Sequence, residues 1–262
     1  MIDELCESAL HQVVKNPMSK TNIIDDLLAN LPSKSVPVRS VLIGAHWTAV
    51  CSTHCGLATT IIGDNCHDHK TVVRDAGSLH LKSAQELAEY AKSDYSLEAS
   101  IGIAAINSLL DMNEQNAVEM NASQVLMEKG AGKNVALVGH FPFIPKLRKS
   151  VKNLWVIELH PTEDDYPANS AAELIPEADI VALTASSLIN HTMDDLLNLC
   201  DPDALVMILG PSTPLSPVLF DHGANIIAGS RVRDENAVLH AIGQGATFQQ
   251  VSGVKLLTFT NP

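Results

Sequence analysis

The sequence lacks features that would direct it to a membrane or to nucleic acid. No apolar run approaches the roughly 18 residues of a membrane-spanning helix. Basic side chains are scarce, because 17 Lys and Arg stand against 30 Asp and Glu, for a net charge of −13. Such an acidic chain is a poor partner for nucleic acid or an anionic membrane surface, and its acidic start is unlike a signal peptide. We therefore expect a cytoplasmic protein whose partner is a small molecule or a metal ion, with a homo-oligomer as one possible state.

Cysteine is also scarce, and its number is odd. Five cysteines without an export signal predict free thiols or a metal site rather than a disulfide framework. A group of soft ligands, here called the Cys/His cluster, comprises Cys51, His54, Cys55, Cys66, His67 and His69. Thiolate and imidazole suit a transition-metal ion such as zinc, but the spacing differs from that of a zinc ribbon. The alternative is a pair of partly buried thiols and a solvated turn, in which Cys51 or Cys55 reacts readily while Cys200 is buried and inert.

The pattern of the 262 residues changes near residue 131, which is consistent with two domains. A helix predicted to begin at Asn121 ends near Gly130, which suits the left-handed residue that closes a helix. Apolar runs separated by helical segments follow, as in a mostly parallel, Rossmann-like sheet. The runs occupy residues 135–139, 154–159, 180–183, 205–209, 226–228 and 256–259, with helices at 193–199 and 234–242.

Residues 1–130 have the pattern of an α+β domain. Helices are predicted at 3–14 and 21–30, followed by antiparallel strands at 36–44, 47–51 and 57–62. Ser83 and Glu86 have the spacing of a capping box at a helix start. The segment 97–110 is apolar nearly all round, so we expect a buried helix. The predicted fold class is α/β, with domains at 1–130 and 131–262.

Polar residues at strand ends suggest a ligand site. Gly139 and His140 follow the first strand of the second domain, but a dinucleotide fingerprint needs further glycines there. Glu158 ends the next strand, about 20 residues after that glycine, where an acidic residue commonly binds a ribose. Glu158 either binds a nucleotide ligand or simply faces solvent.

Two later strand ends also carry small polar residues. Residues 184–192 follow the third strand, and the fourth strand leads into the 210–213 loop, Gly-Pro-Ser-Thr. Prolines fix this loop, so its N–H and O–H groups can meet a ligand at little entropic cost, although each segment alone is also typical of a capped turn. Asn107 lies in the buried helix and needs a hydrogen-bond partner, so we expect it close to the 210–213 loop.

The candidate ligand-binding residues are predicted to gather at one edge of the sheet, where the carboxyl ends of parallel strands meet. They are Asn107, Gly139, His140, Glu158, Thr184, Asn190, Thr192, Gly210, Pro211, Ser212 and Thr213. We expect the 210–213 loop, rather than the Cys/His cluster, to be the functional centre.

Several motifs resemble those of a known family. In the second half they are VGHFPF (138–143), LINHT (188–192) and GPSTPL (210–215); in the first half they are GAHWTA (44–49), GLA (56–58) and SIGIAAIN (100–107). Over nearly the whole chain they resemble the putative heavy-metal chelation family. The resemblance implies a first domain similar to the N-terminal domain of enolases, a Rossmann-like second domain, and a site in the cleft between them.

The same resemblance implies a protein that binds a heavy metal or a metal chelate, including a corrinoid-related one. It assigns no role to the Cys/His cluster and no catalytic residue. Two other functions stay open from the sequence. One is an enzyme that uses a nucleotide or S-adenosylmethionine at the strand ends, and the other is a non-catalytic sensor of a small molecule.

Overall fold

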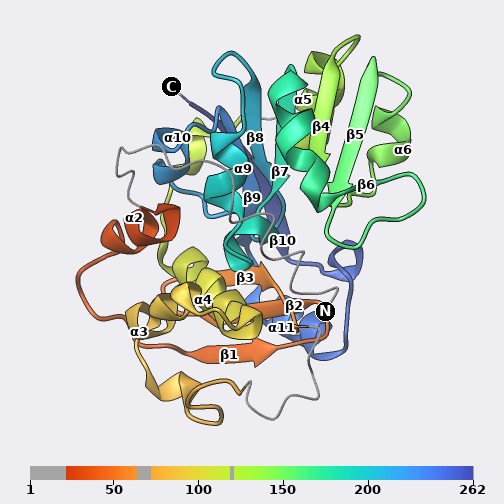
Figure 1. The fold of residues 1–262 in the computed structure, drawn as a ribbon. Helices are drawn as coiled ribbons and strands as arrows, with labels where there is room; N and C mark the ends of the chain where they lie inside the picture. The colour runs from red at the N-terminus through yellow and green to blue at the C-terminus, as the bar shows by residue number, and fades with distance from the viewer. Residues whose placement is uncertain (1–21, 64–71, 119–120, 262) are drawn as a thin grey trace, which may run out of the picture.

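The computed structural model describes residues 22–63, 72–118 and 121–261, which form two packed sheets with their helices (Figure 1). The predicted helix at 3–14 lies outside the described residues. A small antiparallel sheet and a large, mostly parallel sheet confirm the predicted α/β class. Within the described part of the chain, no helix is both long and apolar enough to cross a membrane.

The small sheet confirms the three strands predicted in the first half. Its strands are β1 (Ser40–Ile43), β2 (Trp47–Cys51) and β3 (Cys55–Thr59), paired antiparallel in that order. The helices of this half are α2 (Ile23–Ala29), α3 (Ala84–Ala88) and α4 (Ser96–Leu109). Ser83 and Glu86 form the predicted capping box of α3.

Helix α4 is the buried helix expected from its apolar sequence. Two glycines allow its close packing, because side chains at these positions would collide with backbone atoms. A Cβ on Gly56 of β3 would lie 2.1 Å from the carbonyl oxygen of Ala104, and one on Gly102 would lie 1.9 Å from the nitrogen of Ala91. The helix backbone therefore contacts the sheet directly and fixes the position of Asn107.

The large sheet has the order β10-β9-β8-β7-β4-β5-β6, and only β10 runs antiparallel to its neighbour. Its strands are β4 (Asn134–Val138), β5 (Asn153–Glu158), β6 (Tyr166–Pro167), β7 (Ile180–Thr184), β8 (Leu205–Leu209), β9 (Ile226–Val232) and β10 (Val254–Thr260). The apolar runs thus predicted six of these strands. Because β4 pairs with β5 on one side and β7 on the other, the strand order reverses between β4 and β7.

Helices precede β4 and connect the strands of the large sheet. They are α5 (Ala122–Lys129), α6 (Ile144–Leu147), α7 (Ala171–Leu174), α8 (Ser186–Ile189), α9 (Met193–Asn198), α10 (Val218–Asp221) and α11 (Glu235–Gly243). Single 3₁₀ turns lie at Leu79–Leu81, Glu89–Lys92, Glu114–Asn116, Ala168–Ser170, Ile175–Glu177 and Phe248–Gln250. Asn121 caps α5 as predicted, but the prediction that Gly130 adopts the left-handed conformation was wrong. Gly130 has φ −81°, and the left-handed residue is Gly132 at φ +72°, since the chain turns two residues later.

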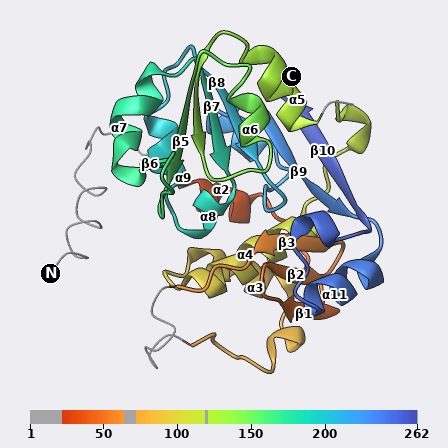
Figure 2. The ribbon, with the colours of Figure 1, turned by 90° about the vertical axis from the view of Figure 1, so that its right-hand side faces the viewer.

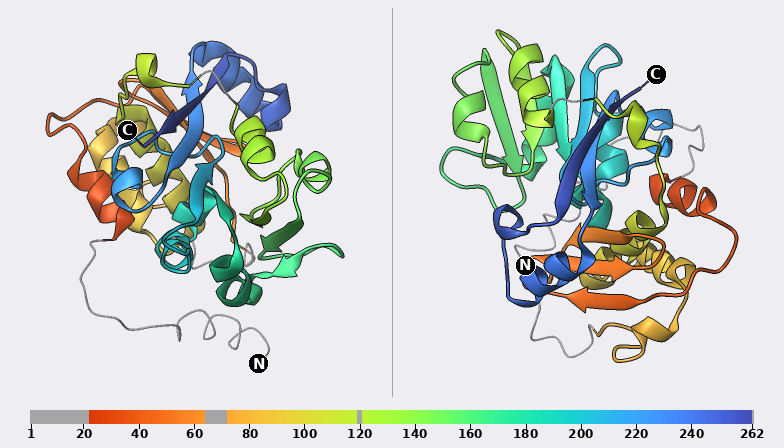
Figure 3. Two further views of the ribbon diagram at one scale, coloured as in Figure 1. Left: turned by 90° about the horizontal axis from the view of Figure 1, so that it is seen from above. Right: turned by 180° about the vertical axis from the view of Figure 1, so that it is seen from behind.

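Helix α11 belongs to the second half of the sequence but packs on the small sheet. Its Val238 and Ile242 form one apolar cluster with Ala49 and Leu57. Figures 2 and 3 show α11 beside the strands of the small sheet, at the end of a long excursion between β9 and β10. The two halves therefore interlock, and a division at residue 131 assigns α11 to a sheet that it does not cover.

Candidate functional site

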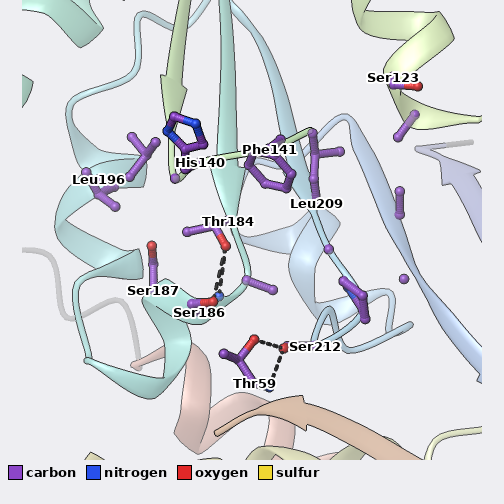
Figure 4. Close-up of a pocket in the computed structure, with 18 of the residues that line it drawn as sticks. Thr59, Ser123, His140, Phe141, Thr184, Ser186, Ser187, Leu196, Leu209 and Ser212 are labelled. Carbon is purple, nitrogen blue, oxygen red and sulfur yellow. Dashed lines mark hydrogen bonds between the residues drawn. The ribbon is translucent and has the colours of Figure 1, made fainter. Parts of the chain in front are cut away.

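A cleft of about 2190 Å³ opens at the carboxyl ends of the parallel strands. Thr59 of β3, labelled in Figure 4, contributes to its lining from the small sheet. Trp47 of β2 lines it as well. The predicted residues that line it are Gly139, His140, Glu158, Thr184, Asn190, Thr192, Gly210, Pro211 and Ser212, whereas Asn107 and Thr213 do not line it. The strand ends thus meet at one cleft, which is what the sequence led us to expect of them.

The turn after β4 is tight because Gly139 adopts φ +105°. A Cβ there would lie 2.8 Å from the Cβ of Thr184, so only glycine lets the ends of β4 and β7 approach this closely. The amide of Gly139 also donates to the carbonyl of Ile157, at 3.1 Å. These contacts place His140 beside the end of β5, where Glu158 lies.

His140 has an acidic partner that the sequence did not indicate. Its Nδ1 lies 3.6 Å from Oδ2 of Asp165, whose side chain is only 2% exposed. Thr162 donates to the same carboxylate through its hydroxyl at 2.6 Å and its amide at 3.0 Å, and these bonds hold the pKa of Asp165 below its usual value. The imidazole therefore has a fixed carboxylate on its Nδ1 side, while the ring itself lines the cleft.

Glu158 is half-buried at the end of β5 and lines the same cleft. Burial raises the pKa of its carboxyl above the ordinary value, although the nearby His140 acts in the opposite direction. The carboxylate thus sits where water is partly excluded, and its affinity for a proton is higher than that of a surface glutamate.

The segment after β7 forms a hydrogen-bonded turn rather than a set of free hydroxyls. The hydroxyl of Thr184 donates to that of Ser186 at 3.2 Å. The Asn190 side-chain oxygen accepts from the hydroxyl of Thr192 at 2.8 Å and from its amide at 3.3 Å. These contacts shape the wall of the cleft.

The 210–213 loop joins the two sheets. The Ser212 hydroxyl accepts from the amide of Thr59 at 2.9 Å, and its oxygen lies 3.1 Å from the Thr59 hydroxyl. Asn107 donates to the carbonyls of Ser212 at 2.9 Å and Leu57 at 2.8 Å, which confirms the predicted proximity of Asn107 to this loop. Ser212 is 2% and Thr213 1% exposed; the Ser212 hydroxyl bonds to Thr59, whereas the buried hydroxyl of Thr213 has no hydrogen-bond partner.

The prediction that the thiols of the Cys/His cluster are free and reactive was wrong for Cys51 and Cys55. Cys51 and Cys55 are joined by a disulfide and are buried as cross-strand neighbours in the β2–β3 hairpin. His54 faces Asp111 at 3.6 Å, and its pKa is lowered by burial and by Arg231. Cys66, His67 and His69 lie outside the described residues. Where the chain is described, no group of three or more His, Cys, Asp or Glu side chains is arranged to hold a metal ion.

Cys200 is half-buried rather than fully buried. Its thiol contacts the carbonyl of Leu196 at 3.4 Å, and burial raises its pKa to about 11. A thiol with so high a pKa forms little of the nucleophilic thiolate at neutral pH, in agreement with the predicted inert character.

Two family models, both described as "Putative heavy-metal chelation", match residues 121–260 and 24–110. The chain belongs to the putative heavy-metal chelation family. A curated relative, an uncharacterised protein of Methanocaldococcus jannaschii, is 29% identical over 165 residues, which is 60% of this chain. The match spans less than two thirds of that protein's own length, 64%.

Two solved structures are similar to this member of the putative heavy-metal chelation family. A DUF364 family protein with unknown function from Desulfitobacterium hafniense DCB-2 has a TM-score of 0.78 and 26% identity, and the match covers 91% of this chain and 98% of that one. Another, from Pyrococcus horikoshii, has a TM-score of 0.74, with 21% identity over 92% of this chain and 98% of its own. At that identity the second likeness shows the fold alone.

Proposed function

We propose that the protein binds a metal ion that is already held by a small organic chelator, with His140 as the donor from the protein. The observation that carries this proposal is the pair formed by His140 and Asp165. Histidines that bind metals commonly have a carboxylate beside the other ring nitrogen, which fixes the tautomer and makes the ligating nitrogen more basic. Here the carboxylate lies on the Nδ1 side, at 3.6 Å, so Nε2 is the nitrogen left for a metal.

The number of donors favours a chelate over a bare ion. Zinc in proteins takes four ligands almost without exception, and sets of four convergent residues form its closed structural sites. The described residues contain no group of even three such side chains. Among the described residues His140 supplies one ligand, and in our proposal the bound molecule supplies the others.

The size and lining of the cleft agree with an organic ligand. Pockets for drug-sized ligands usually have volumes of roughly 300–1,000 Å³, and this cleft has about 2190 Å³. Apolar side chains such as Phe141 and Leu209 line the cleft beside polar ones such as Thr184 and Ser186 (Figure 4). The cleft, in the place predicted from the sequence, is therefore our proposed chelation site.

A probe with a defined chelator tests the proposal. Ni²⁺–nitrilotriacetate keeps coordination positions open for imidazole, and its binding can be measured by calorimetry against free nitrilotriacetate. We expect His140→Ala to abolish the specific binding, while the exposed His80→Ala serves as the matched control. Equal binding by both variants would remove His140 from the site.

The carboxylate behind the imidazole supplies a second variant. Asp165→Asn keeps the shape of the side chain but removes its charge, so affinity for Ni²⁺–nitrilotriacetate should fall about tenfold, as is typical of a lost outer partner. The exposed Asp164→Asn is the control. A change no larger than that of the control would mean that Asp165 does not support a metal-binding role.

A further inference from the structure

The strand order makes the β4–β7 junction a particular place in the cleft. When the strands from β4 to β9 are numbered one to six along the chain, their order across the sheet is 3-2-1-4-5-6. This order reverses between β4 and β7. In open sheets of this type, ligands bind in the crevice outside the carboxyl ends at that reversal, and nucleosides place their sugar at the end of the second strand. The second strand here is β5, which ends in Glu158.

Glu158 is placed to accept hydrogen bonds from two neighbouring hydroxyls. Val138 pairs with Ile157 in the β4–β5 register, so Glu158 lies beside Gly139, which carries no side chain to cover it. The Glu158 carboxylate is half-buried and lines the cleft. A carboxylate has two acceptor oxygens and no donor, which matches the vicinal diol of a ribose.

An aromatic surface lies in the adjoining turn. The rings of Phe141 and Phe143 are stacked, with centroids 5.1 Å apart and planes inclined by 21°. Both rings line the cleft and are half-buried against the apolar cluster under α5 and α6. An immobilised aromatic ring at the edge of a cleft is a surface on which a planar base can stack.

The same turn does not provide a phosphate cradle. Pro142 and Pro145 have no N–H to donate, and α6, which follows, is only four residues long. Binding of pyrophosphate at the first turn of such a sheet relies on glycines and on the N–H groups of a following helix. The turn therefore favours an uncharged nucleoside portion over a dinucleotide.

We propose that the cleft contains a ribonucleoside subsite, in which Glu158 accepts hydrogen bonds from the 2′- and 3′-hydroxyls and Phe141 stacks on the base. This subsite does not depend on a bound metal. The volume of about 2190 Å³ leaves room for a second ligand beside a nucleoside. A ligand with a nucleoside moiety and no phosphate at the β4 turn is the class of molecule that fits.

Binding of the four ribonucleosides and their 2′-deoxy forms, measured by calorimetry in the presence of EDTA, tests the subsite. At least one ribonucleoside should bind, and its 2′-deoxy form about tenfold more weakly, because it lacks one of the two hydroxyls. No binding of any ribonucleoside, or equal affinity for the two forms, would overturn the proposal.

Two variants localise the effect. Glu158→Gln should weaken ribonucleoside binding about tenfold and abolish the discrimination against the deoxy form, whereas the exposed Glu163→Gln should change neither. Phe141→Leu keeps an apolar side chain but removes the ring, so both forms should bind about tenfold more weakly. Unchanged melting temperatures would show that the variants are folded. If Glu158→Gln bound like the wild type, the ribose contact would be wrong.

Discussion

The 210–213 loop and the pair His140–Glu158 line the same cleft but use their polar atoms in different ways. The loop forms hydrogen bonds with other parts of the protein. The Ser212 hydroxyl accepts from the amide of Thr59, and the Ser212 carbonyl accepts from the side chain of Asn107. His140 and Glu158 both line the cleft; Asp165 lies on the Nδ1 side of His140, and the Glu158 carboxyl is half-buried at the end of β5. A loop rich in hydroxyls can therefore be a joint between sheets, while the groups left for a ligand are fewer and lie further along the sheet.

This difference shifts our proposed centre from the loop to the ends of β4 and β5. The sequence suggested the loop because prolines and hydroxyls occur together there. The structure shows that the Ser212 hydroxyl bonds to Thr59 of β3 and that the Ser212 carbonyl bonds to Asn107 of α4. Four experiments test this difference between the loop and the strand ends.

Asn107→Ala should destabilise the fold most. The change leaves the carbonyls of Leu57 and Ser212 without their donor in a buried seam, at a cost of about 2–3 kcal/mol. Urea unfolding measures this cost, and the exposed Asn236→Ala should stay within about 0.5 kcal/mol of wild type. A small effect at Asn107 would mean that the seam does not hold the two sheets together.

Ser212→Ala should have a smaller effect of the same kind. It removes the acceptor of the Thr59 amide, so the free energy of unfolding should fall by about 1–2 kcal/mol. The affinity of the folded protein for Ni²⁺–nitrilotriacetate and for ribonucleosides should change little, because the Ser212 hydroxyl already bonds to Thr59. A variant of full stability that has lost ligand binding would return the functional centre to the loop.

The pH dependence of ribonucleoside binding should report Glu158. Since burial raises the pKa of this carboxyl, the acceptor is lost to protonation at a higher pH than for an exposed glutamate. Affinity should be full well above that raised pKa and fall as the pH decreases through it. In Glu158→Gln the remaining weak binding should not show this step, and persistence of the step would assign it to another group.

The smallest effect on binding is expected for the paired change Cys51→Ser and Cys55→Ser. The disulfide lies in the apolar cluster that the β2–β3 hairpin forms with α11, and neither cysteine lines the cleft. Stability should decrease because two hydroxyls replace a buried covalent link, while affinity for Ni²⁺–nitrilotriacetate stays unchanged. Loss of that affinity in the folded variant would place the metal site in the first half of the chain.

Periodicity and capping signals were sufficient to predict the elements that determine the architecture. The apolar segment at 97–110 predicted α4, and the alternation of apolar runs and helical segments predicted the parallel sheet, because burial on one or two faces leaves a local pattern. The edge strand β6 has only two residues and no such pattern. The side of the molecule on which α11 packs also has no local signal, because an apolar stripe does not specify its partner.

The site was predictable in part for the same reason. The ends of strands can be recognised in the sequence, so the position of the cleft could be predicted from the order of the strands. The approach of Asn107 to the loop could be predicted because an amide in a buried helix needs a hydrogen-bond partner. Asp165 and Thr59 were missed because each becomes relevant only through a residue that is distant in sequence or in another sheet. The Cys51–Cys55 bond was missed because its cross-strand register depends on the hairpin turn, which the sequence pattern left undefined.

The path of α11 constrains how the cleft can change shape. The segment 233–234 carries the chain from β9 to α11, and 244–253 returns it to β10, while 110–118 makes a separate connection that ends beside Thr258 of β10. Rotation of the small sheet as a rigid body would carry α11 with it and bend all three segments at once. If the chain were cut at residue 131, Val238 and Ile242 would be exposed to solvent in one fragment, and Ala49 and Leu57 would be exposed in the other. The packing of α11 on the small sheet thus couples the two sheets through residues that are far apart in the sequence.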